Sequence, residues 1–224
     1  MQTAWSGAAT DTDLERANDF RATMARRRSV RDFSGEAVDR ELIRCAIETA
    51  AQAPSGVNRQ PWRFYAIGDA QARSMVRELA CEQEAEDGGE AARAAFARNV
   101  APVSPDPDKA CFSDAPWLIA VFGALKDPQA VDPFFTRESL GIATGMLVTA
   151  LHVAGVSSLV HAPVAEDYLA EVCGADEADR LFLLVLAGYP ARATRQPAAL
   201  TPRKSFHQVA EFIDGPAGDG TPLD

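Results

Sequence analysis

Apolar residues recur at helical spacing in two stretches near the start of the chain. The spacing predicts helices over residues 12–27 and 39–53, the second of which ends before Pro54. Residues 62–67 (WRFYAI) are aromatic and β-prone, and they predict a strand. A helix over residues 69–84 follows that strand, so the pattern of the first third is helix, helix, strand, helix.

Short, continuous apolar runs dominate the second half of the chain. Residues 117–123, 156–161 and 181–188 predict buried strands. Helical patterns lie between them, near residues 134–154 and 166–173. Helices that alternate with short strands predict an α+β or α/β domain built around one sheet.

One charge-free stretch, residues 139–165, is long enough to raise the question of a membrane span. Several glycines and Pro163 interrupt it, and Gly155 divides a helical part from a β-branched part. The pattern therefore favours a buried helix followed by a buried strand, with no membrane association.

Residues 85–110 are acidic and alanine-rich before three prolines interrupt them, which predicts a surface excursion that could act as a lid. The small and polar residues 1–10 and the turn-forming residues 214–224 predict loose ends, with order over about 12–213. No internal repeat or Pro/Gly-rich linker divides the chain, so a single domain over residues 1–224 is expected.

Composition narrows the function classes. With 22 Lys and Arg against 32 Asp and Glu, the formal net charge is −10, which excludes a generally basic nucleic-acid binder. The four cysteines form no CxxC pair and no leader pattern precedes them, which predicts a cytoplasmic location. The three histidines show no ligand spacing, so no metal site is expected.

A basic island interrupts this acidic chain in the run RRRSVR, which contains Arg26, Arg27, Arg28, Ser29 and Arg31. Guanidinium groups bind phosphate oxygens in bidentate fashion, and the serine adds a hydroxyl. Two alternatives remain: a solvated helix end whose arginines face the negative pole of the helix, and a nucleic-acid patch, which the net charge disfavours.

A second candidate is the loop APSGVNRQPW between a predicted helix and strand. Ser55, Asn58 and Gln60 could hydrogen-bond the edge of a heteroaromatic ligand, and Gly56 would let that ligand approach the backbone. Turn chemistry, in which the amides satisfy their own loop, explains the same residues equally well.

Two glycines, Gly141 and Gly145, lie four residues apart in the predicted 134–154 helix. Small residues at this spacing permit close helix packing. That packing could occur across a subunit interface or within the core of one chain.

Four motifs in order carry a family resemblance: RRSVRDF, APSGVNRQPWRF, GIATGMLVTALHVAG and LLVLAGYPA. Together they resemble the flavin-dependent nitroreductase superfamily over about residues 20–210. The RRSVR, the APSG and a GYP followed by an Arg-Lys pair are most similar to its iodotyrosine deiodinase branch.

The resemblance implies an α+β nitroreductase-like fold, with a central, mostly antiparallel sheet surrounded by helices. It also implies an intertwined homodimer with exchanged termini and FMN at the subunit interface, where one subunit lays its loop over the flavin of the other. The positions that match the cofactor-binding motifs are Arg27, Arg28, Ser29, Arg31, Pro54, Ser55, Gly56, Asn58, Val160, His161, Ala162, Arg203 and Lys204.

The segment that matches the one passing flavin N5 departs from the deiodinase pattern. Deiodinases usually carry a threonine where this chain has Ala162. The threonine hydroxyl favours one-electron chemistry, whereas Ala162 leaves a backbone N–H and suits two-electron transfer. The neighbouring His161 is expected to be a packed strand residue rather than a functional group.

The resemblance also suggests three substrate contacts. The backbone N–H of Val57 would meet a phenolate, Glu84 an ammonium group and Lys109 a carboxylate. Gly88 stands where the deiodinase branch has a tyrosine. Glu84 and Lys109 could equally be solvated surface charges.

These observations predict an FMN-dependent oxidoreductase that uses NAD(P)H to reduce a nitroaromatic, quinone or related small aromatic acceptor by two-electron transfer. The flavin carries the chemistry, so no catalytic side chain is expected. The absence of a GxGxxG fingerprint agrees with a nicotinamide that binds only transiently. A reductive dehalogenase of halogenated tyrosine or phenols is the alternative, and a flavin-binding protein without turnover is a third hypothesis.

Overall fold

The computed structural model describes residues 11–87, 98, 109–123, 135–162, 167–192 and 202–213, and the side chains of residues 83–87 and 167 are not described. It divides the chain into two units, residues 1–194 and 195–224, and each is described by itself. The ends for which the sequence predicts loose structure, and most of the predicted 85–110 excursion, lie outside the described residues.

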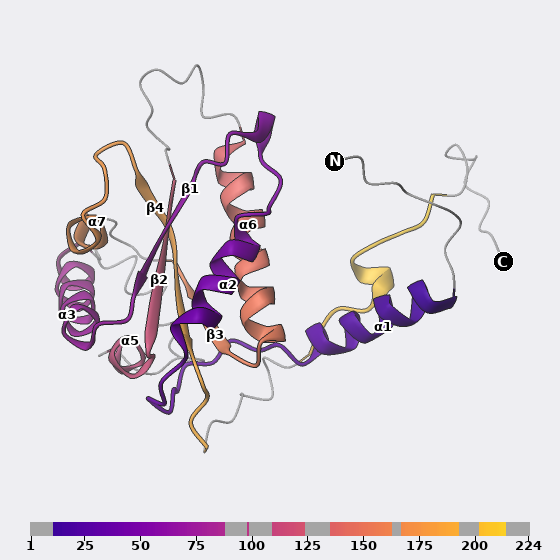
Figure 1. The fold of residues 1–224 in the computed structure, drawn as a ribbon, viewed down its shortest axis with the longest axis horizontal. Helices are drawn as coiled ribbons and strands as arrows, with labels where there is room; N and C mark the ends of the chain where they lie inside the picture. Colours follow the sequence, from indigo (N-terminus) through magenta and orange to yellow (C-terminus); the bar gives the residue numbers. More distant parts are fainter. Residues whose placement is uncertain are drawn as a thin grey trace. The chain divides into compact units, whose positions relative to one another are not determined.

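A four-stranded antiparallel sheet forms the centre of the first unit (Figure 1). Its strands are β1 (Trp62–Ile67), β2 (Trp117–Gly123), β3 (Ser157–His161) and β4 (Arg180–Gly188), in the order β1-β2-β4-β3. The β2 and β4 strands are central, which explains their continuous apolar runs, since both of their faces are covered. The four predicted strands are confirmed to within one residue.

The register of the sheet aligns the ends of the strands. Trp62 lies opposite Gly123 in the β1–β2 pair, and Ser157 lies opposite Gly188 in the β3–β4 pair. An irregularity interrupts the β2–β4 ladder between Val121 and Phe122. All pairings in this sheet are antiparallel, so the predicted α+β class is correct.

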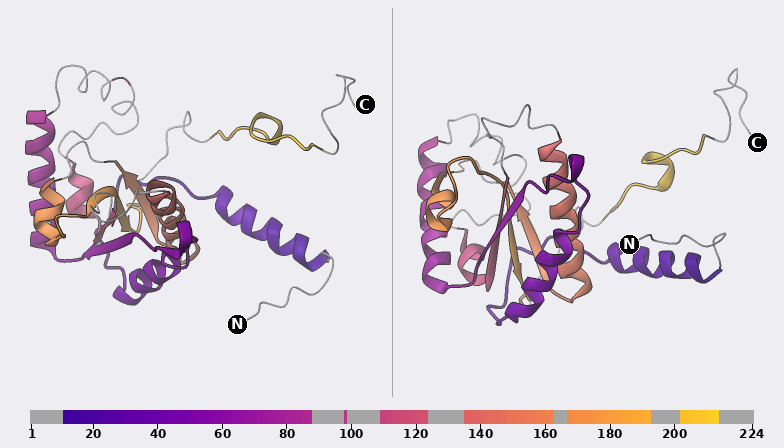
Figure 2. Two further views of the ribbon diagram at one scale, coloured as in Figure 1. Left: turned by 90° about the horizontal axis from the view of Figure 1, so that it is seen from above. Right: turned by 45° about the horizontal axis from the view of Figure 1, so that its top comes forward.

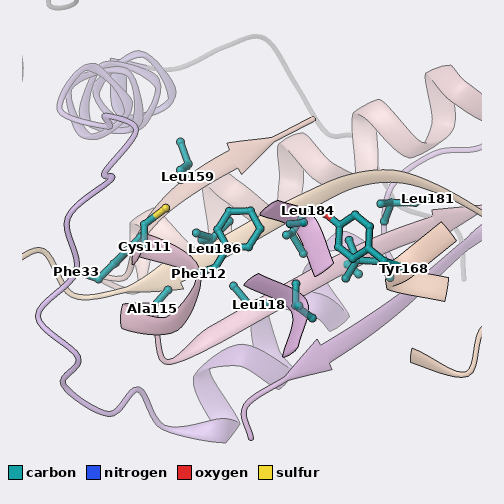
Figure 3. Close-up of a cluster of buried hydrophobic side chains, with 14 of the residues drawn as sticks. Phe33, Cys111, Phe112, Ala115, Leu118, Leu159, Tyr168, Leu181, Leu184 and Leu186 are labelled. Carbon is teal, nitrogen blue, oxygen red and sulfur yellow. The ribbon is translucent and has the colours of Figure 1, made fainter. Parts of the chain in front are cut away.

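Helices cover both faces of the sheet (Figure 2). On one face lie α2 (Arg40–Ala50) and α6 (Thr136–Val153), and on the other lie α3 (Ala70–Asp87), α5 (Ala110–Asp114) and α7 (Asp167–Cys173). Successive strand residues point to opposite faces, so Leu118 packs with the α3/α5/α7 layer and Ile119 with the α2/α6 layer. Figure 3 shows the first of these cores, with Phe112 beside Leu186 and Tyr168 beside Leu184.

The described part of the charge-free stretch, residues 139–162, contains most of α6, then a left-handed Gly155 with φ +80° and then β3, as the pattern indicated. Val156 N–H donates to Leu151 O at 2.8 Å, which closes the helix as left-handed C-terminal residues commonly do. Among the described helices, none has the combination of length and apolar character needed to cross a membrane.

The predicted excursion over residues 85–110 is too long at both ends. Residues 85–87 continue α3, and Ala110 begins α5, a helix that the sequence pattern did not indicate. Five residues are too few for helical periodicity to appear, which explains why α5 was missed.

The N-terminal helix α1 (Asp11–Ala25) has no buried residues, and Leu14 and Phe20 are 64% and 53% exposed. The Nε2 atom of His152, in the last turn of α6, lies 2.9 Å from Thr23 O. A carbonyl only accepts hydrogen bonds, so this nitrogen carries the proton. In the second unit, η3 (Phe206–Gln208) begins with a capping box between Ser205 and Gln208.

Gly188 is required where β4 passes the start of β2. A Cβ atom at this position would lie 2.6 Å from Pro116 Cδ and 2.9 Å from Phe33 Cδ1. Both distances are shorter than atoms tolerate, so a side chain forces the strand, the proline or the phenylalanine to move.

We therefore expect Gly188→Ala to lower the free energy of unfolding by about 1–3 kcal/mol, as measured by urea denaturation. Pro116→Ala removes the nearer of the two clashing rings, and the double variant should lose less stability than the sum of the single changes. Strict additivity would contradict the steric cause.

Candidate functional site

The arginine segment follows α1 and runs beside β3. Ser29 forms a parallel bridge with Ser158, and Val30 N–H donates to Ser158 O at 3.1 Å. Further along, Ser34 N–H donates to Tyr189 O at 2.9 Å, just beyond β4. Backbone hydrogen bonds to two strands therefore fix this segment, which leaves the arginine side chains to their own contacts.

The arginine side chains are half-buried at Arg27, Arg28 and Arg31. Arg28 Nη1 donates to both Ala25 O and Arg27 O at 2.7 Å, so it satisfies carbonyls at the end of α1. The alternative in which the arginines face the end of the preceding helix is therefore correct for Nη1 of Arg28. A guanidinium has five N–H donors, so these bonds do not exhaust Arg28 as a ligand for an anion.

Strand β3 connects the arginine segment to the residues predicted near flavin N5. Ser158 and Ala162 are four residues apart, or about 13 Å along an extended chain. Val160 is 40% exposed, and Ala162 follows the strand in an exposed position. The His161 ring packs edge-to-face against Phe112, with centroids 5.2 Å apart and an angle of 80°, which supports the packed interpretation of this histidine.

The loop at residues 54–60 contains three left-handed residues and none of them is glycine: Val57 (φ 45°), Asn58 (φ 56°) and Gln60 (φ 48°). Val57 is β-branched, a type that rarely adopts positive φ, and its side chain is 87% exposed. Pro54 is exposed, while Ser55 and Gly56 are half-buried. Such backbone strain persists only where neighbouring contacts hold it, and it is concentrated at functional sites.

Hydrogen bonds inside the loop account for part of this conformation. Gln60 N–H donates to Ser55 Oγ at 2.9 Å and Asn58 N–H to Ser55 O at 3.0 Å. The Asn58 and Gln60 side chains bond each other at 3.3 Å, which is the turn chemistry that the sequence left open. Val57 N–H donates to no other residue that the structure describes.

A hydrogen bond between described residues joins the loop to α6, and sequence reasoning missed it. Gly56 N–H donates to Ser139 Oγ at 3.4 Å, and Ser139 is 3% exposed in the first turn of α6. The sequence offered only a weak indication of this contact, which is that one serine lies at a core position of the predicted 134–154 helix.

The two candidate segments lie near opposite ends of α6 in one chain. The loop contacts Ser139 in the first turn, and Thr23, just before the arginine segment, contacts His152 in the last turn. Ser139 and His152 are 13 positions apart, which corresponds to about 20 Å along the helix. One chain therefore does not bring the loop and the arginine segment together.

The remaining candidates are only partly placed. Lys109 is half-buried and left-handed (φ 48°) immediately before α5. Glu84 lies within α3, but its side chain is outside the described residues, as is all of Gly88. Arg203 and Lys204 are exposed in the second unit, so their position relative to β3 is not defined.

The described side chains offer few groups for chemistry without a cofactor. In the described part of the chain, no three His, Cys, Asp or Glu residues are grouped to hold a metal ion. Burial raises the pKa of the Cys173 thiol to about 11, so it is protonated and a poor nucleophile at neutral pH.

Both exposed glycines of α6 have room around them. Gly141 and Gly145 are exposed, and a Cβ atom at Gly145 would meet nothing within 4 Å. Packing among the described residues of this chain therefore does not require glycine at Gly145.

Comparison with known proteins identifies relatives across most of the chain. The nitroreductase family model matches residues 24–189. An iodotyrosine deiodinase from Haliscomenobacter hydrossis is 34% identical over 188 residues, covering 82% of this chain and 85% of the relative. One from Hydra vulgaris is 31% identical, covering 82% of this chain and 70% of the relative.

Solved structures show the same fold. An oxidized iodotyrosine deiodinase bound to FMN and 3-iodo-L-tyrosine aligns with a TM-score of 0.67 at 24% identity, covering 83% of this chain and 95% of that one. A nitroreductase with bound FMN from Bacteroides fragilis also aligns with a TM-score of 0.67, at 18% identity, covering 88% and 100%. The predicted nitroreductase-like fold is therefore confirmed.

The strain at Val57 has a measurable consequence. Val57→Gly should raise the free energy of unfolding by up to about 1 kcal/mol, because glycine adopts φ 45° without steric cost and the gain exceeds its added chain entropy. Val153→Gly, at an exposed right-handed position in α6, should instead lower it by about 0.5–1 kcal/mol. Equal destabilisation by both changes, in urea denaturation, would show that Val57 is not strained.

Proposed function

The chain belongs to the nitroreductase family, and from that membership we propose that it is an FMN-dependent oxidoreductase. In this proposal NAD(P)H supplies the electrons and the acceptor is a nitroaromatic, a quinone or a related conjugated aromatic molecule. One observation carries the proposal: β3 has the arginine segment at its start and the exposed Ala162 beyond its end.

The donor chemistry of this strand suits FMN. Arg27, Arg28 and Arg31 with the Ser29 hydroxyl form a cationic, hydrogen-bond-donating group that matches a phosphate monoester in an otherwise acidic chain. Bound FMN would supply a ring that accepts two electrons and passes them on. Arg31 would stabilise negative charge on the pyrimidine edge of that ring, and the backbone at Ala162 would donate to N5.

The overall reaction balances without a catalytic side chain. NAD(P)H delivers a hydride and solvent a proton, which convert a nitro group to a nitroso group and water, or a quinone to a hydroquinone. The protein's part is to bind both molecules in turn, orient them and exclude water.

We propose that the working unit is a homodimer, in which the loop of one chain completes the site of the other. The separation of the two segments along α6 supports this arrangement, since both match cofactor-binding motifs. Several of the exposed apolar side chains in the described chain would also gain cover from a second copy, among them Leu14, Phe20, Ile142, Phe206, Val209, Phe212 and Ile213.

We also propose Arg203 and Lys204, which belong to the second unit, as phosphate ligands, because they match the C-terminal motif of the family resemblance. The proposed flavin-binding domain is the whole chain, residues 1–224. The four free cysteines suit a reducing compartment, and we propose a cytoplasmic location.

A second candidate function has specific support. The relative from Haliscomenobacter hydrossis, 34% identical, is an iodotyrosine deiodinase, and Lys109 could bind the carboxylate of an amino-acid substrate. In that reaction a hydride equivalent replaces the halogen on carbon and the halogen leaves as halide. Ala162 opposes this candidate, because it provides no hydroxyl for N5.

An anaerobic titration of the purified holoprotein with NADPH tests both candidate functions, the two-electron oxidoreductase and the reductive dehalogenase. In the presence of 4-nitrobenzoate, the proposal expects rapid bleaching of the flavin absorbance and its return as the nitro compound is consumed. Inertness to NADPH with halide release from 3-iodotyrosine under dithionite would favour the dehalogenase. Absence of turnover with every acceptor would indicate a flavin-binding protein without activity.

The phosphate assignment predicts loss of cofactor. Replacing both Arg28 and Arg203 with alanine should weaken FMN binding at least about a hundredfold, since each charge-assisted bond contributes about 1.5–3 kcal/mol. The control is Arg26→Ala, because Arg26 is exposed and lies one residue before the RRSVR motif that matches the cofactor-binding positions. Equal absorbance near the flavin maximum, relative to protein, in the double variant and the parent would overturn the assignment.

The N5 assignment predicts an electrochemical change. Ala162→Thr should raise the first one-electron reduction potential relative to the second by about 90 mV, because an added hydrogen bond of about 1 kcal/mol to the one-electron-reduced ring shifts the two potentials by about 45 mV each in opposite directions. Ala162→Val has nearly the same shape without the hydroxyl and should leave the separation unchanged. Identical behaviour of the two variants in spectroelectrochemistry would place Ala162 away from the flavin.

A further inference from the structure

Three hydroxyl groups on α6 bond to the carbonyl one turn earlier. Ser139 Oγ donates to Phe135 O at 2.7 Å, Thr144 Oγ1 to Leu140 O at 2.7 Å and Thr149 Oγ1 to Gly145 O at 2.8 Å. Such bonds are ordinary for serine and threonine within helices. Ser139 differs from the two threonines because its oxygen also accepts the Gly56 N–H, 83 positions away in sequence.

The direction of each bond follows from the groups involved. A carbonyl cannot donate, so the single Ser139 proton points to Phe135 O. The lone pairs of the same oxygen are thereby turned toward the loop, where the Gly56 N–H meets them. Phe135 itself is left-handed (φ 62°), and its carbonyl also accepts the Ser139 N–H at 2.9 Å, so the first turn of α6 holds the hydroxyl in one orientation.

Ser139 fixes the place of the strained loop on the body of the protein, through its hydrogen bond with Gly56 N–H. The Ser55 hydrogen bonds lie within the loop and move with it, so they fix its shape but not its place. The Ser139 contact instead joins the loop backbone to a buried position on α6, the helix that packs on the sheet. Strain at Val57, Asn58 and Gln60 persists only if the surroundings determine the conformation.

We infer that Ser139 is a positioning residue that sets the direction of the adjacent Val57 N–H toward the acceptor. This inference rests on the proposed function, in which that N–H meets an oxygen of the acceptor. Negative charge grows on this oxygen during reduction, so an aligned donor stabilises the transition state more than the bound ground state. The bond from Gly56 is long at 3.4 Å, so its effect lies in orientation more than in stability.

Two variants that remove only a hydroxyl test the inference. Ser139→Ala removes the bond to Gly56, whereas Thr144→Val removes an equivalent helix bond that does not contact the loop. Hydrogen exchange of the segment containing residues 54–60 should become about threefold faster in Ser139→Ala, as the loss of one long hydrogen bond implies, and remain unchanged in Thr144→Val. Ser139→Thr keeps a hydroxyl and should restore slow exchange.

Stopped-flow kinetics of the holoprotein then separates the two half-reactions. Ser139→Ala should slow flavin reoxidation by 4-nitrobenzoate about tenfold, less than the loss expected when a donor is removed outright, while flavin reduction by NADPH stays within about twofold of the parent. Equal slowing of both half-reactions, or unchanged exchange in Ser139→Ala, would overturn the inference.

The exchange measurement keeps this test distinct from that of the proposed function, because it does not require turnover. Faster exchange in Ser139→Ala together with unchanged reoxidation would support the role of Ser139 in holding the loop. It would overturn the inference that Ser139 orients the Val57 N–H toward the acceptor. A parent protein that holds no flavin would overturn the proposed function, and with it the kinetic role of Ser139.

Discussion

The burial of α6 against the sheet fixes the two points at which the helix contacts the loop and the end of α1, from which the arginine segment continues. Leu140, Leu147 and Leu151 are fully buried on one side of this helix and pack with Val121 and Val185 of the central strands. Each such side chain contributes about 1.5–3 kcal/mol of apolar burial, so the helix is firmly docked. Its two ends then hold neighbouring segments by single polar contacts, Ser139 to the loop and His152 to the end of α1.

Much of the fold could be predicted because its strongest signals are local. The central strands are uninterrupted apolar runs, and the break at Gly155 separates α6 from β3. The strand order β1-β2-β4-β3 could not be obtained in this way, since pairing depends on contacts between distant residues. The start of α5 also escaped prediction, because it follows Lys109 in a left-handed conformation that its side chain does not indicate.

The candidate site shows the same division. The arginine segment and the loop were found by their residue types, and β3 does connect the first of them to Ala162. Two features could not be predicted from residue types. Arg28 donates hydrogen bonds to carbonyls at the end of α1, and the loop is left-handed at three residues other than glycine. Local sequence preference argues against that loop conformation, and such conflicts are expected where a site rather than stability has been selected.

The folded-back position of Arg28 links α1 to the occupancy of the proposed anion site. The carbonyls of Ala25 and Arg27 hold only the Nη1 donors of the guanidinium, so they compete with a phosphate for that nitrogen and leave Nε and Nη2 available. The apparent affinity of a phosphate that needs Nη1 is then reduced by the fraction of molecules in which the two carbonyls hold it. By thermodynamic reciprocity, such a ligand weakens the end of α1 to the same extent, so cofactor binding and fraying of that helix end are two readings of a single equilibrium.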